Sequence, residues 1–278
     1  MRLGYLGPPG TFSEEALRAQ PLPTDAELVP FASIHETVMA VEDGSVDRAL
    51  VPIENALEGG VGATLDAIAV DASDVAIVGE AVLAIRNCLV AREELAPRDI
   101  AVVVSHPQPL AQCARFLRSE LPQAEVRPST STAEAVRTVA ATTEPWAALG
   151  PQGAAERYGC RVLRDGIDDD PENATRFVWL GRTGSEPVGG GSSWKTSVVF
   201  AGAGDLQPGW LVRCLSEFAF RGVNLTKIES RPRRGRLGHY LFHVDMDGRD
   251  DEAAVSDAVR ALHAHCEVVR LLGSYPAA

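Results

Sequence analysis

The sequence lacks the features of an exported or membrane protein. No apolar run approaches the roughly 20 residues that a bilayer-spanning helix needs. The first residues, Met1-Arg2-Leu3-Gly4-Tyr5, have the pattern of a strand and not that of a signal peptide. We therefore expect a cytoplasmic protein with no membrane partner.

Patterns that bind metals or cofactors are also missing. The five cysteines are isolated, which argues against a disulfide framework or a zinc site. His239 and His243 would lie about 13 Å apart on one predicted strand, too far to share an ion. Since there is no glycine-rich phosphate loop and no nucleophile elbow, any chemistry must use hydrogen bonds and fixed charge. We expect neither a metal nor a cofactor.

Basic residues are fewer than acidic ones. The chain has 26 Lys and Arg against 38 Asp and Glu, a net charge of -12, which argues against nucleic acid as a partner. An anionic ligand would have to be held by local donors against this field. At 278 residues the chain is long enough for two domains with substantial cores.

The chain opens with a strand over residues 2–6, a glycine turn, and a helix over residues 13–19. The first amides of a helix lack partners and carry positive potential, so this turn can form an anion cradle near Thr11. The spacing is not that of a dinucleotide-binding turn. A plain strand-to-helix connection without a ligand is the alternative.

Polar residues follow two further predicted strands. The strand over residues 48–55 ends on Glu54 and Asn55, and Ser105 follows the strand over residues 100–104, with Gln112 on the next helical turn. Ligands in open α/β sheets bind beyond the carboxyl ends of strands. The alternation of strands and helices predicts mainly parallel sheets. We expect two α/β lobes with a cleft between them, the second lobe spanning about 80–160.

Thr175-Arg176-Phe177 leads into an apolar strand-like run. If the triplet lies in the strand, Thr175 and Phe177 share one face and Arg176 takes the other. If the strand begins only after Arg176, the triplet is a loop at the strand edge. By itself such a triplet is ordinary scaffold; its company upstream makes it a candidate site.

A linker of Gly and Ser over residues 184–194 follows. Beyond it, residues 195–275 have the β-α-β-β-α-β order of a ferredoxin-like domain. We therefore expect a catalytic unit over residues 1–183 and a separate C-terminal domain.

Together, five motifs in this order resemble the prephenate dehydratase family, and the resemblance spans nearly the whole chain. The motifs are Gly7-Pro8-Pro9-Gly10-Thr11-Phe12-Ser13, Val51-Pro52-Ile53-Glu54-Asn55, Ser105-His106-Pro107-Gln108 with Gln112-Cys113, Thr175-Arg176-Phe177, and Glu229-Ser230-Arg231-Pro232. The resemblance implies a two-lobed catalytic part like the type 2 periplasmic binding proteins, followed by an ACT domain that binds phenylalanine. It implies decarboxylative dehydration of prephenate to phenylpyruvate without a cofactor, and a homodimer or homotetramer.

The resemblance also implies roles for individual residues. Thr175 is the expected donor to the leaving hydroxyl, with Asn55, Ser105 and Gln112 orienting the substrate and the leaving group. Thr11 and Arg176 are expected to hold carboxylates, with Glu54 and Phe177 at the substrate site. If Arg176 points across the strand, Thr11 must carry more of the binding. The expected phenylalanine site comprises Gly209, Trp210, Leu211, Asn224, Leu225, Glu229, Ser230, Arg231 and Pro232.

Two positions depart from the family pattern. Ala56 stands where Ser is usual, and Trp210 stands where a small residue is usual. The indole either fills space meant for the effector ring or points into the packing of its own helix.

Three other functions stay open at this point. They are a prephenate decarboxylase of the same fold, an arogenate dehydratase, and a non-catalytic amino-acid sensor. Thr175 argues against the decarboxylase, because that reaction keeps the hydroxyl. We also expect a protein ending near Arg182 to keep some dehydratase activity and lose its response to phenylalanine.

Overall fold

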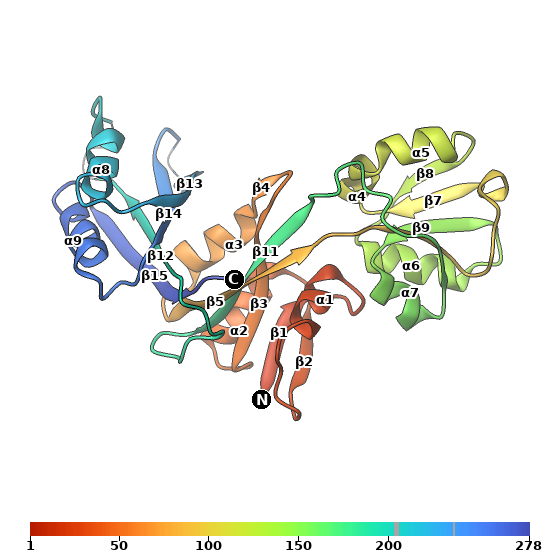
Figure 1. Ribbon diagram of the computed structural model, residues 1–278, viewed down its shortest axis with the longest axis horizontal. Coiled ribbons are helices and arrows are strands. Elements are labelled where there is room, and N and C mark those ends of the chain that lie inside the picture. The colour runs from red at the N-terminus through yellow and green to blue at the C-terminus, as the bar shows by residue number, and fades with distance from the viewer. Residues whose placement is uncertain (203–205, 236) are drawn as a thin grey trace.

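The computed structural model describes residues 1–202, 206–235 and 237–278. The chain forms three bodies in a row, with lobe 1 between lobe 2 and the C-terminal domain (Figure 1). Lobe 1 contains β1 (Arg2–Leu6), α1 (Phe12–Arg18), β2 (Glu27–Phe31), α2 (Ile34–Glu42), β3 (Arg48–Asn55), β4 (Gly59–Gly60), α3 (Gly62–Asp66), a π-helical turn (Ala67–Asp71), β5 (Val75–Ala84) and β11 (Ala174–Arg182).

Lobe 2 lies between the two halves of lobe 1 in the sequence. It contains β6 (Cys88–Ala91), a short 3-10 helix (Pro97–Asp99), β7 (Val102–Ser105), α4 (Pro107–Gln112), α5 (Ala114–Glu120), β8 (Glu125–Pro128), α6 (Thr132–Ala141), β9 (Trp146–Gly150), α7 (Gln152–Tyr158) and β10 (Arg161–Arg164). The C-terminal domain contains β12 (Trp194–Ala201), α8 (Trp210–Ala219), β13 (Leu225–Pro232), β14 (Tyr240–Asp247), α9 (Ala253–Leu262) and β15 (Val268–Pro276).

Both lobes have mixed sheets. In lobe 1 the strand order is β2-β1-β3-β11-β5, where β1 runs parallel to β2 and β3, and β11 runs antiparallel to β3 and β5. In lobe 2 the order is β10-β6-β9-β7-β8, where β7 runs parallel to β8 and β9, and β6 runs antiparallel to β9 and β10. The expectation of mainly parallel sheets is wrong, because each crossing between the lobes reverses the chain direction and returns it antiparallel.

The two crossings are the segments 85–87 and 165–173, which run side by side between the lobes (Figure 1). Asn87 joins them: its backbone N–H and its Nδ2 donate to the two carboxylate oxygens of Asp168, at 2.7 and 2.6 Å. The crossings therefore form a braced connection. The two-lobed α/β fold expected from the sequence is confirmed.

The C-terminal domain is an antiparallel sheet in the order β13-β14-β12-β15 with α8 and α9 on one face. This is the expected ferredoxin-like, ACT-like arrangement. Leu211 and Phe218 of α8 pack into the core of this domain, and the helix is followed by Gly222 at φ +69°. None of the described helices has the length and apolar character of a bilayer-spanning helix.

Lobe 1 and the C-terminal domain share one hydrophobic core. Leu241, Leu272 and Tyr275 of the C-terminal sheet pack in the same cluster as Ile68 and Ile77 of lobe 1. The sheet face opposite α8 and α9 is therefore covered by lobe 1. The two parts are not joined by the linker alone.

Candidate active site

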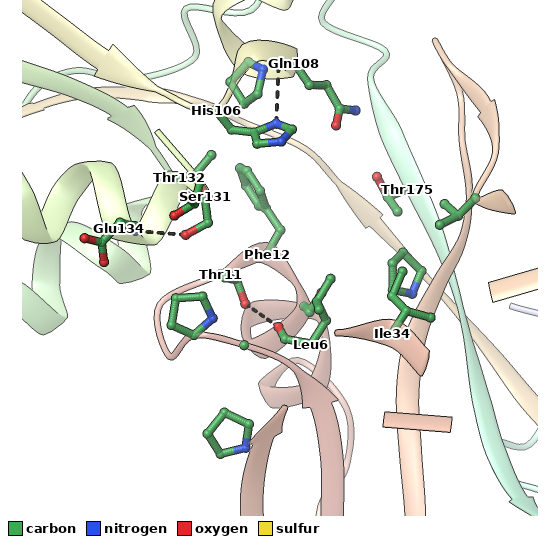
Figure 2. Close-up of a pocket in the computed structure, with 18 of the residues that line it drawn as sticks. Leu6, Thr11, Phe12, Ile34, His106, Gln108, Ser131, Thr132, Glu134 and Thr175 are labelled. Atoms are coloured by element: carbon green, nitrogen blue, oxygen red, sulfur yellow. Dashed lines mark hydrogen bonds between the residues drawn. The ribbon is translucent and has the colours of Figure 1, made fainter. Parts of the chain in front are cut away.

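A cavity of about 770 Å³ lies between the two lobes. Lobe 1 contributes residues from the β1–α1 turn, the β2–α2 connection, the end of β3 and the start of β11, while lobe 2 contributes α4 and the start of α6. Figure 2 shows Thr11 and Thr175 on the lobe 1 side, and His106, Ser131 and Thr132 on the lobe 2 side. The cleft expected from the sequence thus corresponds to a cavity lined by both lobes.

Thr175 and Asn55 meet at this cavity. Neighbouring strands bring them together, since β11 pairs antiparallel with β3 and Thr175 lies opposite Asn55. Asn55 Nδ2 donates to Thr175 Oγ1 at 3.0 Å. Asn55 Oδ1 accepts the backbone N–H groups of Leu57 and Glu58, at 3.1 and 3.2 Å, so the amide orientation of Asn55 is fixed. The hydroxyl of Thr175 receives a hydrogen bond and keeps its own hydrogen.

Gln112 belongs to the same hydrogen-bonded group. Asn173, a buried residue just before β11, accepts from Asn55 Nδ2 at 3.0 Å and donates from its own Nδ2 to Gln112 Oε1 at 3.2 Å. Gln112 lines the cavity, and its Nε2 is buried without a hydrogen-bond partner among the described residues. Asn173 precedes the Thr175-Arg176-Phe177 triplet, and the sequence assigned it no role of its own. Its polar side chain next to Thr175 was the only signal, and its contact with Gln112 cannot be read from spacing.

The lobe 2 wall is rich in hydroxyl groups. Thr130, Ser131 and Thr132 line the cavity at the start of α6. Ser131 caps this helix: its Oγ accepts the N–H of Glu134 at 3.0 Å. No role was assigned to this wall from the sequence, although Ser followed three residues later by Glu is a signature of a helix start. The start of α6 offers unpaired N–H groups and positive potential to the cavity.

Thr11 lies on the opposite wall. Its hydroxyl donates to the carbonyl of Leu6 at 2.9 Å and accepts the N–H of Glu14 at 3.4 Å, so it caps α1. Phe12 points from the start of α1 into the space between the lobes, toward His106 (Figure 2). The Nδ1 of His106 accepts the N–H of Gln108 at 3.4 Å. The residues that line the cavity, all of them within the described ranges, include no Lys and no Arg.

Ser105 does not reach the cavity. It is fully buried at the end of β7, and its hydroxyl donates to the carbonyl of Leu149 on β9 at 2.7 Å. The hydroxyl is thus used to join two strands of lobe 2. The expectation that Ser105 orients the substrate is not supported, because the side chain after the strand end, and not the last one in the strand, faces the cleft.

Arg176 and Glu54 also lie outside the cavity. Thr175 and Phe177 line it, whereas Arg176 takes the other face of β11, as strand alternation requires. There its guanidinium contacts the carboxylates of Glu54, Glu80 and Asp245, at 3.1, 3.2 and 2.5 Å. Burial acts against the charged form of Arg176, but Asp245 and the other carboxylates outweigh it and raise the pKa. Arg176 and Glu54 are therefore not placed to contact a ligand in this cavity.

The residues expected to bind phenylalanine are divided between two places. Gly209, Trp210 and Leu211 line a cavity of about 220 Å³ together with Tyr240 and Phe242. Trp210 is buried, its Nε1 donates to the carbonyl of His265 at 2.7 Å, and its ring lies 5.7 Å from that of Phe242. The indole therefore belongs to the packing of the domain while forming one wall of this cavity.

The second place is the face of β13 toward lobe 1. A Cβ added to Gly60 would overlap the carboxylate of Glu229, and one added to Gly62 would lie 2.7 Å from the guanidinium of Arg231. Arg231 also forms an ion pair with Asp66 at 2.8 Å. By alternation Ser230 and Pro232 take the opposite face of β13 from Glu229 and Arg231. Asn224 Nδ2 donates to Asp247 at 2.7 Å, and Leu225 packs against the domain core.

Comparisons with known proteins agree with this architecture. A family model described as prephenate dehydratase matches residues 3–185. The prephenate dehydratase of Mycobacteroides abscessus is 41% identical over 281 residues, which are 99% of this chain and 90% of the relative. The crystal structure of prephenate dehydratase from Arthrobacter aurescens in complex with L-Phe has a TM-score of 0.90 at 40% identity, covering 99% of this chain and 90% of that one. A quorum-quenching acylase, GqqA, has a TM-score of 0.87 at 27% identity, covering 100% and 98%.

Proposed function

The chain belongs to the prephenate dehydratase family, and we propose that the cavity between its lobes is the place where prephenate reacts. The enzyme is a hydro-lyase of phenylalanine biosynthesis. Its reaction removes the ring carboxylate as carbon dioxide and the ring hydroxyl as water, and it leaves phenylpyruvate.

The reaction determines what the cavity must supply. The bond from the ring to its carboxylate breaks, and that electron pair enters the ring as the bond to the hydroxyl oxygen breaks. The hydroxyl leaves with the electron pair of its bond to the ring and takes up one proton, which comes from solvent, to become water. Because the ring becomes aromatic, no strong base is needed. The site must hold a dianion and stabilise negative charge on the leaving oxygen.

Thr175 is the proposed donor to that oxygen. Since Asn55 donates to Thr175 Oγ1, the hydroxyl hydrogen is not needed within the protein and can point at the substrate. A neutral threonine is too weak an acid to give up its proton, so it acts as a positioned hydrogen-bond donor. This arrangement of Thr175 and Asn55 at the cavity is the observation that carries the proposal.

The two carboxylates of prephenate must be held by neutral groups, because no Lys or Arg is among the described residues that line the cavity. We assign this role to the start of α6, with Ser131 and Thr132, and to the turn at Thr11. Glu134 also lines the cavity, and its ion pair with Arg137 at 2.7 Å reduces the repulsion between its carboxylate and an anion there. Phe177 supplies apolar contact for the ring.

Incubation with prephenate, followed by the absorbance of the phenylpyruvate enolate in alkali, tests this function. A dehydratase gives phenylpyruvate, a decarboxylase gives a product that keeps the hydroxyl, and a sensor gives no turnover. Parallel assays with arogenate measure the preference between the two substrates. Absence of phenylpyruvate from folded enzyme would contradict the proposal.

The similarity to GqqA raises amide hydrolysis as a second function. A serine or threonine nucleophile for that reaction needs a base within hydrogen-bond reach. The hydroxyls of Thr11, Ser131 and Thr175 are instead bonded to backbone groups or to Asn55, and none of their hydrogen bonds within the described residues involves His106. This geometry favours the dehydratase reaction over an acylase reaction.

We further propose that residues 1–183 form the catalytic unit, residues 184–194 a linker, and residues 195–275 a regulatory domain that binds phenylalanine. The cavity lined by Gly209, Trp210 and Leu211 is the proposed effector site, supported by the L-Phe complex of the Arthrobacter aurescens relative. Calorimetric titration of phenylalanine, with the dehydratase rate measured in parallel, tests this assignment. Sedimentation with and without phenylalanine tests for a homodimer or homotetramer.

A further inference from the structure

In the hydrogen bonds beside Thr175, the side chain of Asn55 determines which groups donate and which accept. Backbone N–H groups can only donate, so the oxygen that accepts from Leu57 and Glu58 must be Oδ1 of Asn55. The other end of this amide, Nδ2, must therefore be the end that faces Thr175 and Asn173. The orientation of Asn55 is thus fixed by the backbone.

The orientation of Asn55 determines the orientation of Asn173, which in turn determines that of Gln112 in lobe 2. Because Asn55 donates, Asn173 presents its Oδ1 to Asn55, at 3.0 Å, and its Nδ2 points the other way. That Nδ2 donates to Gln112 Oε1 at 3.2 Å. Gln112 must then present Nε2, a donor, in place of an acceptor. This Nε2 is the buried group without a partner among the described residues, on a side chain that lines the cavity.

Burial and backbone hydrogen bonds hold Asn173 in place. Only 1% of it is exposed. Its carbonyl accepts the N–H of Ile85 on the other crossing at 2.8 Å, and its own N–H donates to Asp170 at 3.4 Å. The residue therefore lies where both crossings meet lobe 1, and its side chain joins α4 of lobe 2 to β3 of lobe 1.

We propose that Asn173 is a positioning residue of the dehydratase reaction, which fixes the amide of Gln112 so that Nε2 is offered to an oxygen of the substrate. This inference rests on the proposed function of the cavity. It does not make Asn173 a catalytic residue, since Asn173 does not line the cavity. Its effect on the reaction passes through Gln112 and Asn55.

Asn173→Asp tests which groups donate and which accept in this series of hydrogen bonds, with little change in the shape of the side chain. An aspartate still accepts from Asn55 but cannot donate to Gln112, so Gln112 must turn Nε2 toward residue 173 and present its oxygen to the cavity. We expect kcat/KM for prephenate to fall by at least tenfold, with the melting temperature reported alongside. Activity within a factor of two of the parent would overturn the proposal.

A double-mutant cycle with Gln112→Ala separates positioning from a general structural role. We expect Asn173→Ala to lower kcat by at least tenfold in the parent but by less than threefold when Gln112 is already alanine. Asn87→Ala is the matched control, since Asn87 is also a buried asparagine at the crossings but bonds to Asp168. It should lower kcat by the same factor in both backgrounds. An equal factor for Asn173→Ala in both backgrounds would overturn the proposal.

If neither Asn173 variant folds, Gln112→Met tests the role of the Gln112 amide without a change at Asn173. We expect a tenfold or larger fall in kcat/KM, and parent-like kcat/KM would overturn the proposal. Failure of this inference differs from failure of the proposed function. In the first case the parent converts prephenate and the variants do too, whereas in the second the parent does not convert it at all.

Discussion

Arg176 and Asp245 are 69 residues apart in the sequence, and Arg176 Nη2 lies 2.5 Å from Asp245 Oδ2. Arg176 directly follows Thr175, whose side chain lines the cavity on the other face of β11. The proposed donor and the contact with the C-terminal domain are therefore adjacent residues of one strand. Lys195 adds a second contact across this boundary, 2.8 Å from Glu80.

Arg176→Leu is expected to lower stability much more than substrate binding. The change leaves Glu80 and Asp245 buried beside an apolar group, which costs about 3 to 5 kcal/mol for a buried pair. The KM should stay near that of the parent, contrary to the role of a carboxylate anchor. Urea unfolding and steady-state kinetics measure the two effects. Arg182→Leu is the control, because Arg182 lies on the same strand as Arg176 but forms an exposed pair with Asp74. Loss of that pair should cost at most about 1 kcal/mol. A raised KM with unchanged stability would contradict the assignment.

A protein that ends at Arg182 is expected to be unstable. The sequence led us to expect an independent catalytic unit, but Leu241, Leu272 and Tyr275 belong to the core of lobe 1. Their loss would expose apolar surface and leave Arg176 without Asp245. Expression and thermal melting of the shortened protein measure this. A soluble product with the melting temperature of the full chain would show that the shared core is dispensable.

Trp210→Ala is expected to destabilise the C-terminal domain by about 3 to 5 kcal/mol, since the indole is buried against Phe200 and Phe242. Trp210→Phe keeps an aromatic ring in the packing and loses the hydrogen bond to His265 and part of the ring volume, so it serves as the milder variant. Calorimetric titration of phenylalanine into Trp210→Phe then reports on the effector cavity without loss of the fold. Unchanged affinity in this variant would place Trp210 outside the effector site.

Because of His243, we expect the protein to lose stability in mild acid. It is buried between the domains without a hydrogen-bond partner among the described residues, near Asp245, Asp66, Lys227 and Arg231. Desolvation lowers its pKa to about 4, against the effects of Asp245 and Asp66. Below pH 6.5 His243 binds a proton in the unfolded chain but stays neutral in the folded chain. Stability therefore falls as the pH drops from 6.5 toward 4.

The expected loss from this group is about 2 kcal/mol between pH 7 and pH 5. Urea unfolding at both pH values, for the parent and for His243→Leu, isolates it from the other titrating groups. The leucine variant should lose less stability over this interval. Equal losses in both proteins would mean that His243 takes up its proton in the folded state.

The sequence predicted most of the fold from local signals. The strand, glycine turn and helix at the start of the chain and the β-α-β-β-α-β order of the C-terminal domain both follow from patterns of neighbouring residues. The direction of the strands could not be predicted in the same way. It depends on how the two crossings at 85–87 and 165–173 return to lobe 1.

Site residues followed the same division. Strand alternation was enough to place Thr175 and Phe177 on one face and Arg176 on the other. It could not tell which face is the cavity. No role could be assigned to Asn173 from the sequence, because its partners Asn55 and Gln112 lie 118 and 61 residues away, and only folding brings the three amides together.

The most direct test of the account is the kinetics of Thr175→Ala with prephenate, compared with Thr175→Ser. Removal of the hydroxyl should lower kcat by on the order of a hundredfold or more and leave KM nearly unchanged, since the contact forms chiefly in the transition state. Serine keeps a hydroxyl that can accept from Asn55, and it should recover most of the rate. If Thr175→Ala, folded and with the melting temperature of the parent, stays within a factor of a few of the parent kcat, Thr175 is not the donor to the leaving oxygen.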